Sequence, residues 1–415
     1  MAKQVIVVGA GIVGVACAAS LLRDGHDVVL IDREGPAAGA SQGNAGALSP
    51  GSCVPLAMPG VLKKVPSWLL DPEGPLVVRP AYLLKALPWL LRFVASARPA
   101  RVASASDALR ALHQSVFEFY APLVRNAECA DLLKRSGTLN LYKSKGALDA
   151  SKIEWRMRSE RGAEVQFIQG PEIGQLQPGI SETYPYAVFL PEHGYIADPK
   201  QLVSRLANAF EASGGKLLRE DVTEIGSRGG RATVTLGTGS ILDADEVVVA
   251  AGAWSATLLA RAGLRIPLES QRGYQVTLQG CSISPRLPVT LTDEKVYVTP
   301  MLQGLRIAGT VEFAGLTAAP NWNRARRLVD ILARVYPQAT YSSFTDWMGH
   351  RPTLPDSLPV IGRIRSLPGV IAAFGHGHNG MTGGPITGSI VADLVAHREP
   401  SIDVSPFRAE RFAFS

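Results

Sequence analysis

The chain has few cysteines, and none of them falls in a pattern that binds metal or builds a disulfide framework. The four cysteines are spread over 415 residues, without a C-x-x-C pair and without a histidine at metal-ligand spacing. Zinc sites and disulfide-rich secreted folds need such patterns. The sequence therefore predicts no metal site and a reducing compartment, which we take to be the cytoplasm. The cysteines are Cys17, Cys53, Cys129 and Cys281.

Long apolar runs are also absent. No window holds the ~20 uninterrupted apolar residues that a membrane-spanning helix needs. The nearest candidate, residues 61–95, is interrupted by five prolines and by several charges. Its tryptophans and leucines alternate with lysine and arginine, a mixture that suits a lipid interface. We expect either peripheral membrane contact through residues 61–95, at the inner face of the cell membrane, or short helices that cover a substrate cleft.

Basic runs interleaved with aromatic residues are missing as well. The net charge of +6 and the isoelectric point near 9.2 come from lysines and arginines scattered along the chain. Nucleic-acid sites gather such residues on one face, so we expect no nucleic-acid partner. With 46% hydrophobic and 19% charged residues, the chain is long and apolar enough for two ordered domains.

A dinucleotide-binding fingerprint is present at the N-terminus. A β-branched apolar run leads into Gly9-x-Gly11-x-x-Gly14, and an alanine-rich helical pattern follows. In this motif the first glycine permits the tight turn, the second lets the backbone approach a pyrophosphate, and the third lets the helix pack on the strand. Asp32, about twenty residues on, can accept hydrogen bonds from a ribose. The pattern predicts FAD or NAD, because both carry the same ADP half.

The loop at residues 40–60 is rich in glycine, serine, proline and asparagine. Small residues let a planar ligand approach the backbone, and Ser41, Gln42 and Asn44 supply hydrogen-bonding groups. This composition favours a ligand-contacting loop, with an ordinary surface loop as the alternative.

Periodicity predicts the remaining elements and a second sheet. Strands that alternate in polarity lie between Gln271 and Phe313, as in an antiparallel sheet. A buried strand ending at residue 249 runs into a glycine turn, as at the N-terminus, so sequence after residue 190 completes the nucleotide-binding domain. Helical spacing is present at residues 104–133, 147–161, 199–213, 321–337 and 384–397.

Six segments together resemble the FAD-dependent amino acid oxidoreductases of the D-amino acid oxidase and glycine oxidase superfamily, especially the bacterial D-amino acid dehydrogenases. They are GAGIVG with Asp32, SQGNAGALSPG, VVAAGAWS, RGYQVT, GHRPTLPDSLPVIG and GHGHNGMTGGPITG, in order along nearly the whole chain. The resemblance implies an α/β fold in which a Rossmann-like FAD-binding domain is interleaved with an antiparallel-sheet substrate domain. The first would comprise residues 1–60, 190–268 and 346–415, and the second 61–189 and 269–345.

The resemblance also implies which residues hold FAD. The glycine motif would bind the pyrophosphate, the loop after Ser41 would line the flavin, and the glycine-rich C-terminal turn would cap it. Some relatives attach FAD through a histidine in the first loop or a cysteine nearer the C-terminus; Gly43 and Asn44 stand in this loop and no cysteine follows Cys281, so we expect non-covalent FAD. The expected contacts are Gly9, Ala10, Gly11, Ile12, Val13, Gly14, Asp32, Arg33, Ser41, Gln42, Asn44, Ala45, Gly46, Leu48, Val222, Ala251, Gly252, Trp254, Gly375, Gly377, His378, Asn379, Gly380, Met381 and Thr382.

Arg351, in the segment G-H-R-P, matches the arginine that binds the substrate carboxylate in this superfamily. A guanidinium suits that planar, bidentate contact. Tyr274 is the expected second carboxylate contact, and His378 the expected hydrogen-bonding neighbour of the flavin. Arg351 as a structural ion-pair partner and Tyr274 as a core residue are the alternatives. The remaining expected substrate contacts are Leu48, His350 and Asn379.

The implied reaction is the dehydrogenation of a D-amino or cyclic imino acid, such as D-alanine, D-proline or hydroxy-D-proline. A hydride would pass from Cα to flavin N5, and the electrons would then pass to a quinone or other acceptor. No protein base is obligatory, since the protein mainly positions the substrate. The alternatives are an oxygen-using amino acid oxidase of the glycine or sarcosine type, a flavin-binding subunit of a hetero-oligomeric dehydrogenase, and a nicotinamide dehydrogenase.

Overall fold

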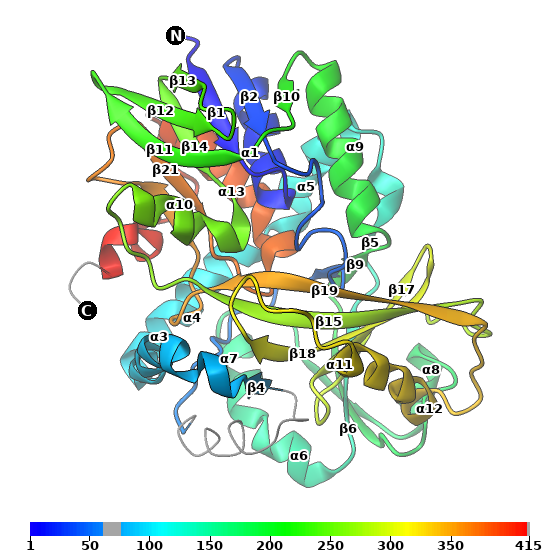
Figure 1. Ribbon diagram of the computed structural model, residues 1–415. Helices are drawn as coiled ribbons and strands as arrows, with labels where there is room; N and C mark the ends of the chain where they lie inside the picture. Colours follow the sequence, from blue (N-terminus) through cyan, green and yellow to red (C-terminus); the bar gives the residue numbers. More distant parts are fainter. Residues whose placement is uncertain (61–75, 413–415) are drawn as a thin grey trace.

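The computed structural model describes residues 1–60 and 76–412 (Figure 1). A six-stranded and a nine-stranded sheet organise the molecule, accompanied by two three-stranded sheets. In Figure 1 the six-stranded sheet lies in the upper half, and the long strands β15 (Glu269–Gln279) and β19 (Ser343–Thr353) cross the lower half. The predicted α/β class, with a Rossmann-like part and a sheet-based part, is confirmed.

The six-stranded sheet has the order β10-β2-β1-β14-β21-β20. All its neighbours pair in parallel except β20 and β21. Runs such as QVIVV and EVVV form these strands because parallel strands are covered on both faces and read as continuous apolar segments. The strands are β1 (Gln4–Val8), β2 (Asp27–Ile31), β10 (Lys216–Leu218), β14 (Glu246–Val249), β20 (Val360–Arg363) and β21 (Val370–Phe374).

Helices cover one face of this sheet, and a small sheet with one helix covers the other. The first layer contains α1 (Ile12–Arg23), α5 (Val116–Asn126), α9 (Pro199–Ala212) and α13 (Gly380–Val395). The second contains α10 (Ser255–Arg261) and the sheet of β11 (Val222–Arg228), β12 (Arg231–Leu236) and β13 (Ile241–Ala244).

Helix α5 packs in a different part of the molecule from the domain to which its residues were assigned. It falls within residues 61–189, which were expected to belong to the substrate domain, yet Val116, Tyr120, Leu123 and Val124 are buried in the core beneath the six-stranded sheet. Their spacing places them on one helix face. Helix α4 (Pro99–His113) also contacts α13. These helices therefore support the nucleotide-binding part.

The nine-stranded sheet has the order β19-β15-β18-β17-β16-β6-β8-β7, with β4 beside β18. It is mostly antiparallel, but β16 pairs with β6, and β18 with β4, in parallel. Strand β19 crosses residue 346, the expected domain boundary, and pairs with β15 as far as Thr353. The other strands are β4 (Leu76–Val78), β6 (Thr138–Tyr142), β7 (Gln166–Gln169), β8 (Tyr186–Leu190), β16 (Val289–Leu291), β17 (Val296–Met301) and β18 (Gly304–Phe313).

Helix α13 begins earlier than predicted, at Gly380, and contains Pro385. Proline has no N–H to donate to the carbonyl four residues before it. In this helix that carbonyl belongs to Met381, and it accepts a hydrogen bond of 2.8 Å from the Tyr120 hydroxyl. The proline is therefore tolerated inside the helix.

Two other predicted helices are divided. Residues 147–161 form α6 (Lys145–Ala150) and α7 (Lys152–Glu160), and residues 321–337 form α11 (Trp322–Arg326), a 3₁₀ turn and α12 (Ile331–Val335). The remaining elements are α3 (Leu83–Ser96), α8 (Pro171–Leu176) and the small sheet of β3 (Ala47–Leu48), β5 (Leu133–Lys134) and β9 (Gly194–Ile196).

All four cysteines are free thiols. Across residues 1–60 and 76–412, no helix combines the length and the apolar character needed to cross a bilayer. Within the same ranges, no three histidine, cysteine or acidic side chains lie close enough together to hold a metal ion.

Candidate active site

The glycine motif forms the predicted turn between β1 and α1. Gly9 has a φ of +107°, and a Cβ there would lie 2.5 Å from the carbonyl oxygen of Ala250. A Cβ on Gly14 would lie 1.7 Å from the carbonyl oxygen of Gly9, so the helix packs directly on the turn. Gly11 is the N-cap of α1. The first amides of a helix have no partner within it, so this backbone forms a cradle that fits a pyrophosphate.

The Asp32 carboxylate lies beside that cradle. Its Oδ2 accepts the backbone N–H of Ala10 at 2.8 Å, and its Oδ1 accepts those of Glu34 and Gly35, each at 2.9 Å. These bonds fix the carboxylate at the end of β2. Ionised carboxylate oxygens have lone pairs beyond those used here, so Asp32 can also accept a ribose hydroxyl as predicted.

The cofactor loop, residues 41–49, uses its own polar side chains to hold its shape. Ser41 Oγ accepts the N–H of Ile12 at 3.0 Å, which joins the loop to the start of α1. Asn44 donates to the carbonyls of residues 40 and 41 and accepts the N–H of Gly46 at 2.8 Å. Ser41 and Asn44, predicted to hydrogen-bond the cofactor, thus use these polar groups to fold the loop itself.

The nine-stranded sheet also holds this loop. Arg306 donates to the carbonyl of Asn44 at 2.8 Å, and Thr299 donates to that of Ala45 at 2.9 Å. Arg306 is buried, and burial lowers its pKa to about 10, so it remains charged at neutral pH. The sequence analysis missed both residues, because nothing in their own segments indicates that they meet a loop more than 250 positions away.

Three basic side chains hold the continuation of the loop at residues 50–52. Arg110 donates to the carbonyl oxygen of residue 50 at 2.7 Å, and Arg158 donates to that of residue 51 at 3.2 Å. The Nδ1 of His113 lies 2.6 Å from the carbonyl oxygen of residue 52. Burial lowers the pKa of His113 to about 4, so its imidazole is neutral near pH 7. The loop is therefore anchored along both of its halves.

Arg351 lies on β19 and is a half-buried cation. Its Nη1 donates to the carbonyl of Thr310 at 2.9 Å, and its guanidinium lies over Gly273, where a Cβ would be only 2.0 Å from its Cζ. Burial lowers the pKa of Arg351 to about 10, which leaves it protonated at neutral pH. No carboxylate in the described part of the chain forms an ion pair with it. The guanidinium is thus available for an anionic ligand.

His378 lies near Arg351. His378 is exposed to solvent in this structure, and desolvation by the protein around it, together with the charge of Arg351, lowers its pKa. The two meet because the turn at residues 375–379 is tied to the end of β19: the N–H of Gly377 donates to Pro352 at 2.8 Å, and Thr353 pairs with His376. This turn reaches the cofactor loop too, since the N–H of residue 49 donates to Thr382 at 3.2 Å in the first turn of α13.

Tyr274 lies on the opposite face of the sheet from Arg351. Side chains alternate along a strand, and Gly273, under the guanidinium, is the neighbour of Tyr274. The Tyr274 hydroxyl donates to Glu312 at 2.6 Å and accepts the N–H of Asn321 at 2.9 Å. Tyr274 is 1% exposed and packs in the core beneath α11 and α12. The structure does not bring Tyr274 together with Arg351, and its contacts are those of a core residue.

His350 is also separated from Arg351 by the alternation along β19. Its Nδ1 lies 2.7 Å from Ser270 Oγ, and its ring meets the edge of Trp254 at 5.4 Å between centroids. The Arg33 guanidinium also stacks on the Trp254 ring, with its Cζ 4.5 Å from the ring centroid. Burial lowers the pKa of His350 to about 4. Arg33, Trp254 and His350 thus form one cluster at the junction of the two large sheets.

A row of side chains that the sequence analysis missed lies on the face that holds Arg351. Strand pairing aligns Trp347 with Gln275, Gln275 with Ala308, and Ala308 with Tyr297. Tyr297 is half-buried, and burial raises its pKa to about 12. The tyrosine on this face of the sheet is therefore Tyr297. The alternating pattern in KVYVTPM shows which of its side chains share a face of the sheet, but it does not show which face is turned toward the cofactor loop.

The remaining residues predicted to contact the cofactor or substrate are backbone positions or packed apolar side chains near the glycine turn and the cofactor loop. Leu48 is fully buried in β3, and Val222 begins β11 in the core that contains Ile31. Residues 251–254 follow β14 beside the Gly9 turn, and Asn379 is the N-cap of α13.

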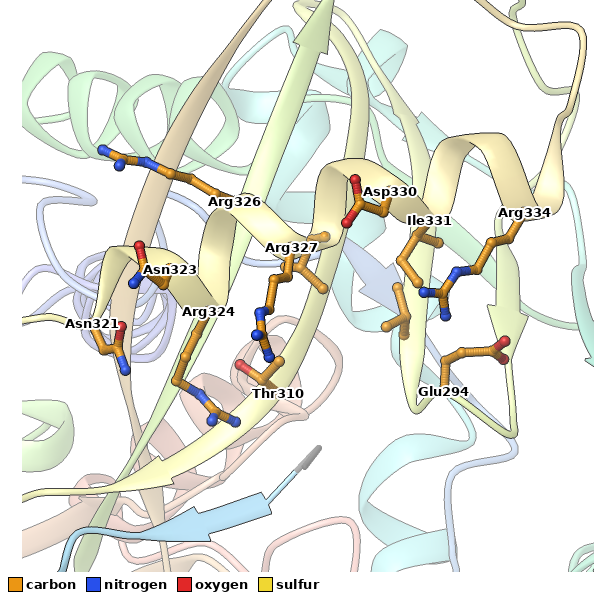
Figure 2. Close-up of a pocket in the computed structure, with 12 residues that line it drawn as sticks. Glu294, Thr310, Asn321, Asn323, Arg324, Arg326, Arg327, Asp330, Ile331 and Arg334 are labelled. Atoms are coloured by element: carbon orange, nitrogen blue, oxygen red, sulfur yellow. The ribbon is translucent and has the colours of Figure 1, made fainter. Parts of the chain in front are cut away.

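A hollow of about 990 Å³ lies under the helical segment of α11 and α12 (Figure 2). Asn321, whose N–H binds Tyr274, is among its lining residues. None of its described lining residues comes from the cofactor loop or from residues 375–382. This hollow therefore does not belong to the candidate active site. Its four arginines are Arg324, Arg326, Arg327 and Arg334.

Comparison with known proteins supports the same cofactor. The profile of the family described as FAD dependent oxidoreductase matches residues 4–394. A D-amino-acid oxidase of Bradyrhizobium diazoefficiens is 40% identical and covers 99% of both chains. A D-amino acid dehydrogenase of Sinorhizobium medicae is 31% identical over 99% of this chain and 100% of its own.

A solved structure has the same fold. The crystal structure of glycine oxidase from Geobacillus kaustophilus has a TM-score of 0.75 and 23% identity, over 99% of this chain and 98% of that one. The resemblance inferred from the sequence motifs is confirmed. The glycine turn and Asp32 form a cradle whose shape fits the dinucleotide half of FAD. The chain belongs to the FAD dependent oxidoreductase family, and its cofactor is FAD.

Proposed function

We propose that this enzyme oxidises small D-amino acids or cyclic imino acids of the D-alanine, D-proline or hydroxy-D-proline type. The observation that carries the proposal is the half-buried, cationic Arg351, which has no carboxylate partner in the described part of the chain and lies near His378 of the C-terminal turn. An amino acid carboxylate supplies the missing anion in a planar form that a guanidinium can bind through two hydrogen bonds. The names of the two curated relatives agree with this substrate class.

The protein's part in the reaction is mainly to hold the substrate in place. Arg351 uses one N–H for Thr310, and a guanidinium has others for a carboxylate. Neutral His378 beside it can hydrogen-bond the substrate or the flavin edge without adding a second charge. When bound, FAD accepts the hydride that leaves the substrate α-carbon. A primary amine substrate would yield an imine that hydrolyses to a 2-oxo acid and ammonia.

The test is anaerobic mixing of the purified flavoprotein with both enantiomers of alanine and proline and with the hydroxyprolines. We expect D-alanine, D-proline or hydroxy-D-proline to bleach the flavin absorbance, and L-alanine to leave it unchanged. Absence of bleaching by every compound would overturn the proposal and favour a flavin-binding subunit without its own activity.

We propose a quinone or similar carrier as the electron acceptor. Oxygen is the alternative, because the 40% identical relative is named an oxidase while other relatives are named dehydrogenases. Measuring peroxide release against reduction of a quinone analogue under air distinguishes the two. Stoichiometric peroxide with slow quinone reduction would overturn the dehydrogenase assignment.

We also propose that α3 contacts an anionic bilayer. Of the segment expected to do so, residues 61–75 lie outside the described residues. Leu84, Leu87 and Leu91 recur at helical spacing on the outer face of α3 and are 83%, 44% and 63% exposed. Exposed Lys85 and Arg98 flank this leucine face and complement anionic headgroups. On the inner side, Trp89 donates to the carbonyl of Thr353 on the strand of Arg351, at 3.2 Å.

Replacing both Leu84 and Leu91 with serine should weaken binding to phosphatidylglycerol-containing vesicles about tenfold, because apolar area enters the interface on binding. Vesicle co-sedimentation measures this. The matched control is Ile153→Ser, which alters an equally exposed apolar residue (71%) on α7. Equal losses in both variants, or no binding by the unaltered protein, would contradict this contact.

A further inference from the structure

Trp347 occupies an unusual position between the cofactor loop and the sheet. A Cβ on Gly43 would lie 2.3 Å from the indole Cδ2, and a Cβ on Gly349 would lie 2.0 Å from the indole Cη2. Both glycines therefore let the indole lie flat against backbone on its two sides. The indole closes the space between loop and sheet at this point.

The indole is also a neighbour of the Arg351 guanidinium. Gly349, which contacts the indole, is paired directly with Gly273, which lies under the guanidinium. The Cβ positions of such a pair are about 5 Å apart. The side chain of an amino acid whose carboxylate binds Arg351 would therefore need only a few carbon atoms to reach the indole of Trp347.

A second hollow, of about 290 Å³, begins on the other side of the indole. It extends along β15 away from Gly273, since Gln275, Thr277 and Gln279 line it at successive positions on the face that holds Arg351. Its wall is polar, and three of its four charged residues have partners within the chain, Asp346 through an ion pair with Arg326 at 3.6 Å; the fourth, Lys200, is exposed. Arg306 binds the carbonyl of Asn44, and Asp198 accepts the N–H of Gln201 at 3.0 Å. The remaining lining residues are Gln42, Gly43, Gln303, Thr345 and Trp347.

We propose that Trp347 is the residue that limits the length of the substrate side chain, and that the polar hollow behind it is a latent side-chain subsite for uncharged hydrogen-bonding groups. The inference rests on the proposed function. It narrows the preferred substrates to D-amino acids with short or cyclic side chains, because the indole stands where a longer side chain would extend. A side chain that passed the indole would meet glutamine amides and threonine hydroxyls, which favour an amide over a hydrocarbon of equal length.

The experiment compares the unaltered enzyme with Trp347→Ala and Trp347→Phe, using D-alanine, D-glutamine and D-norleucine in anaerobic flavin reduction. We expect Trp347→Ala to raise the D-glutamine to D-alanine ratio of kcat/KM at least about tenfold, within the range that a change of pocket size produces. The gain should be smaller for D-norleucine, and Trp347→Phe should stay near the unaltered ratio. Trp322→Ala is the matched control, because it removes an exposed indole (37%) from α11.

A binding measurement separates substrate selection from turnover. Calorimetric titration with propanoate and 4-carbamoylbutanoate, which lack the amino group, should show the same preference change in Trp347→Ala. Bound FAD and melting temperature establish that each variant is folded. If D-alanine reduces the unaltered enzyme but the ratios are unchanged in folded Trp347→Ala, the inference is overturned while the proposed function stands. An equal gain for D-norleucine would overturn the polar subsite.

Discussion

Replacing Arg351 with methionine should lower kcat/KM for flavin reduction by D-alanine by about 10²- to 10³-fold, while FAD remains bound. Methionine retains the apolar stem of the side chain but has no donor for a carboxylate. Truncating one partner of a buried, hydrogen-bonded charge pair costs about 2–5 kcal/mol, and each 1.4 kcal/mol corresponds to about tenfold. Stopped-flow reduction under anaerobic conditions measures the loss.

The size of this effect depends on how few other cations could take over. Arg306 is on the same face of the sheet, but its guanidinium is used by Asn44 and by Thr277 Oγ1 at 3.2 Å. Arg351→Lys should therefore restore only part of the rate, because an ammonium keeps the charge but not the planar fork. A rate for Arg351→Met within twofold of the unaltered enzyme, at full FAD content, would remove the basis of the proposed function.

Gly273→Ala tests the same contact without removing the charge. The new methyl group would lie 2.0 Å from Arg351 Cζ, so the guanidinium must move. We expect a loss in kcat/KM that approaches that of Arg351→Met. Gly174→Ala on α8 is the control, because a Cβ there meets nothing within 4 Å.

The sequence was most informative where chemistry depends on residues that are close in the chain. The turn from Gly9 to Gly14 and the position of Asp32 follow from local spacing, and the structure has the predicted turn and the carboxylate beside it. Arg351 was singled out because its segment carries a motif, and its role as the carboxylate-binding residue stays a prediction.

The faces of the nine-stranded sheet could not be predicted in this way. Tyr274 and Tyr297 both lie in alternating segments, and only the pairing of β15, β17 and β18 decides which hydroxyl shares a face with Arg351. The same limit applies to Arg110 and Arg158, whose partners are carbonyls in a loop far away in the sequence. The start of α13 at Gly380, before Pro385, could not be predicted either, because the carbonyl that the proline leaves free is satisfied by the Tyr120 hydroxyl on another helix.

Replacing Asp32 with alanine should weaken FAD binding about 10²-fold, equivalent to about 2.7 kcal/mol. The carboxylate holds three backbone N–H groups, those of Ala10, Glu34 and Gly35, and is the expected acceptor of the adenosine ribose. Hydrogen bonds to a charged group contribute about 1.5–3 kcal/mol each. Its loss therefore removes one ligand contact and releases the turn that carries the pyrophosphate cradle. Titration of the apoprotein with FAD, followed by flavin fluorescence, measures the affinity.

Asp32→Asn separates the two contributions. The amide oxygen can still accept one or two of the backbone N–H groups, but it lacks the charge and the second acceptor atom. We expect an affinity loss of about tenfold, between those of the unaltered protein and Asp32→Ala. Asp27→Asn, an exposed change at the start of the same strand, serves as the control. If Asp32→Ala binds FAD as tightly as this control does, the carboxylate contributes neither a ribose contact nor the shape of the cradle, and the predicted role of Asp32 is wrong.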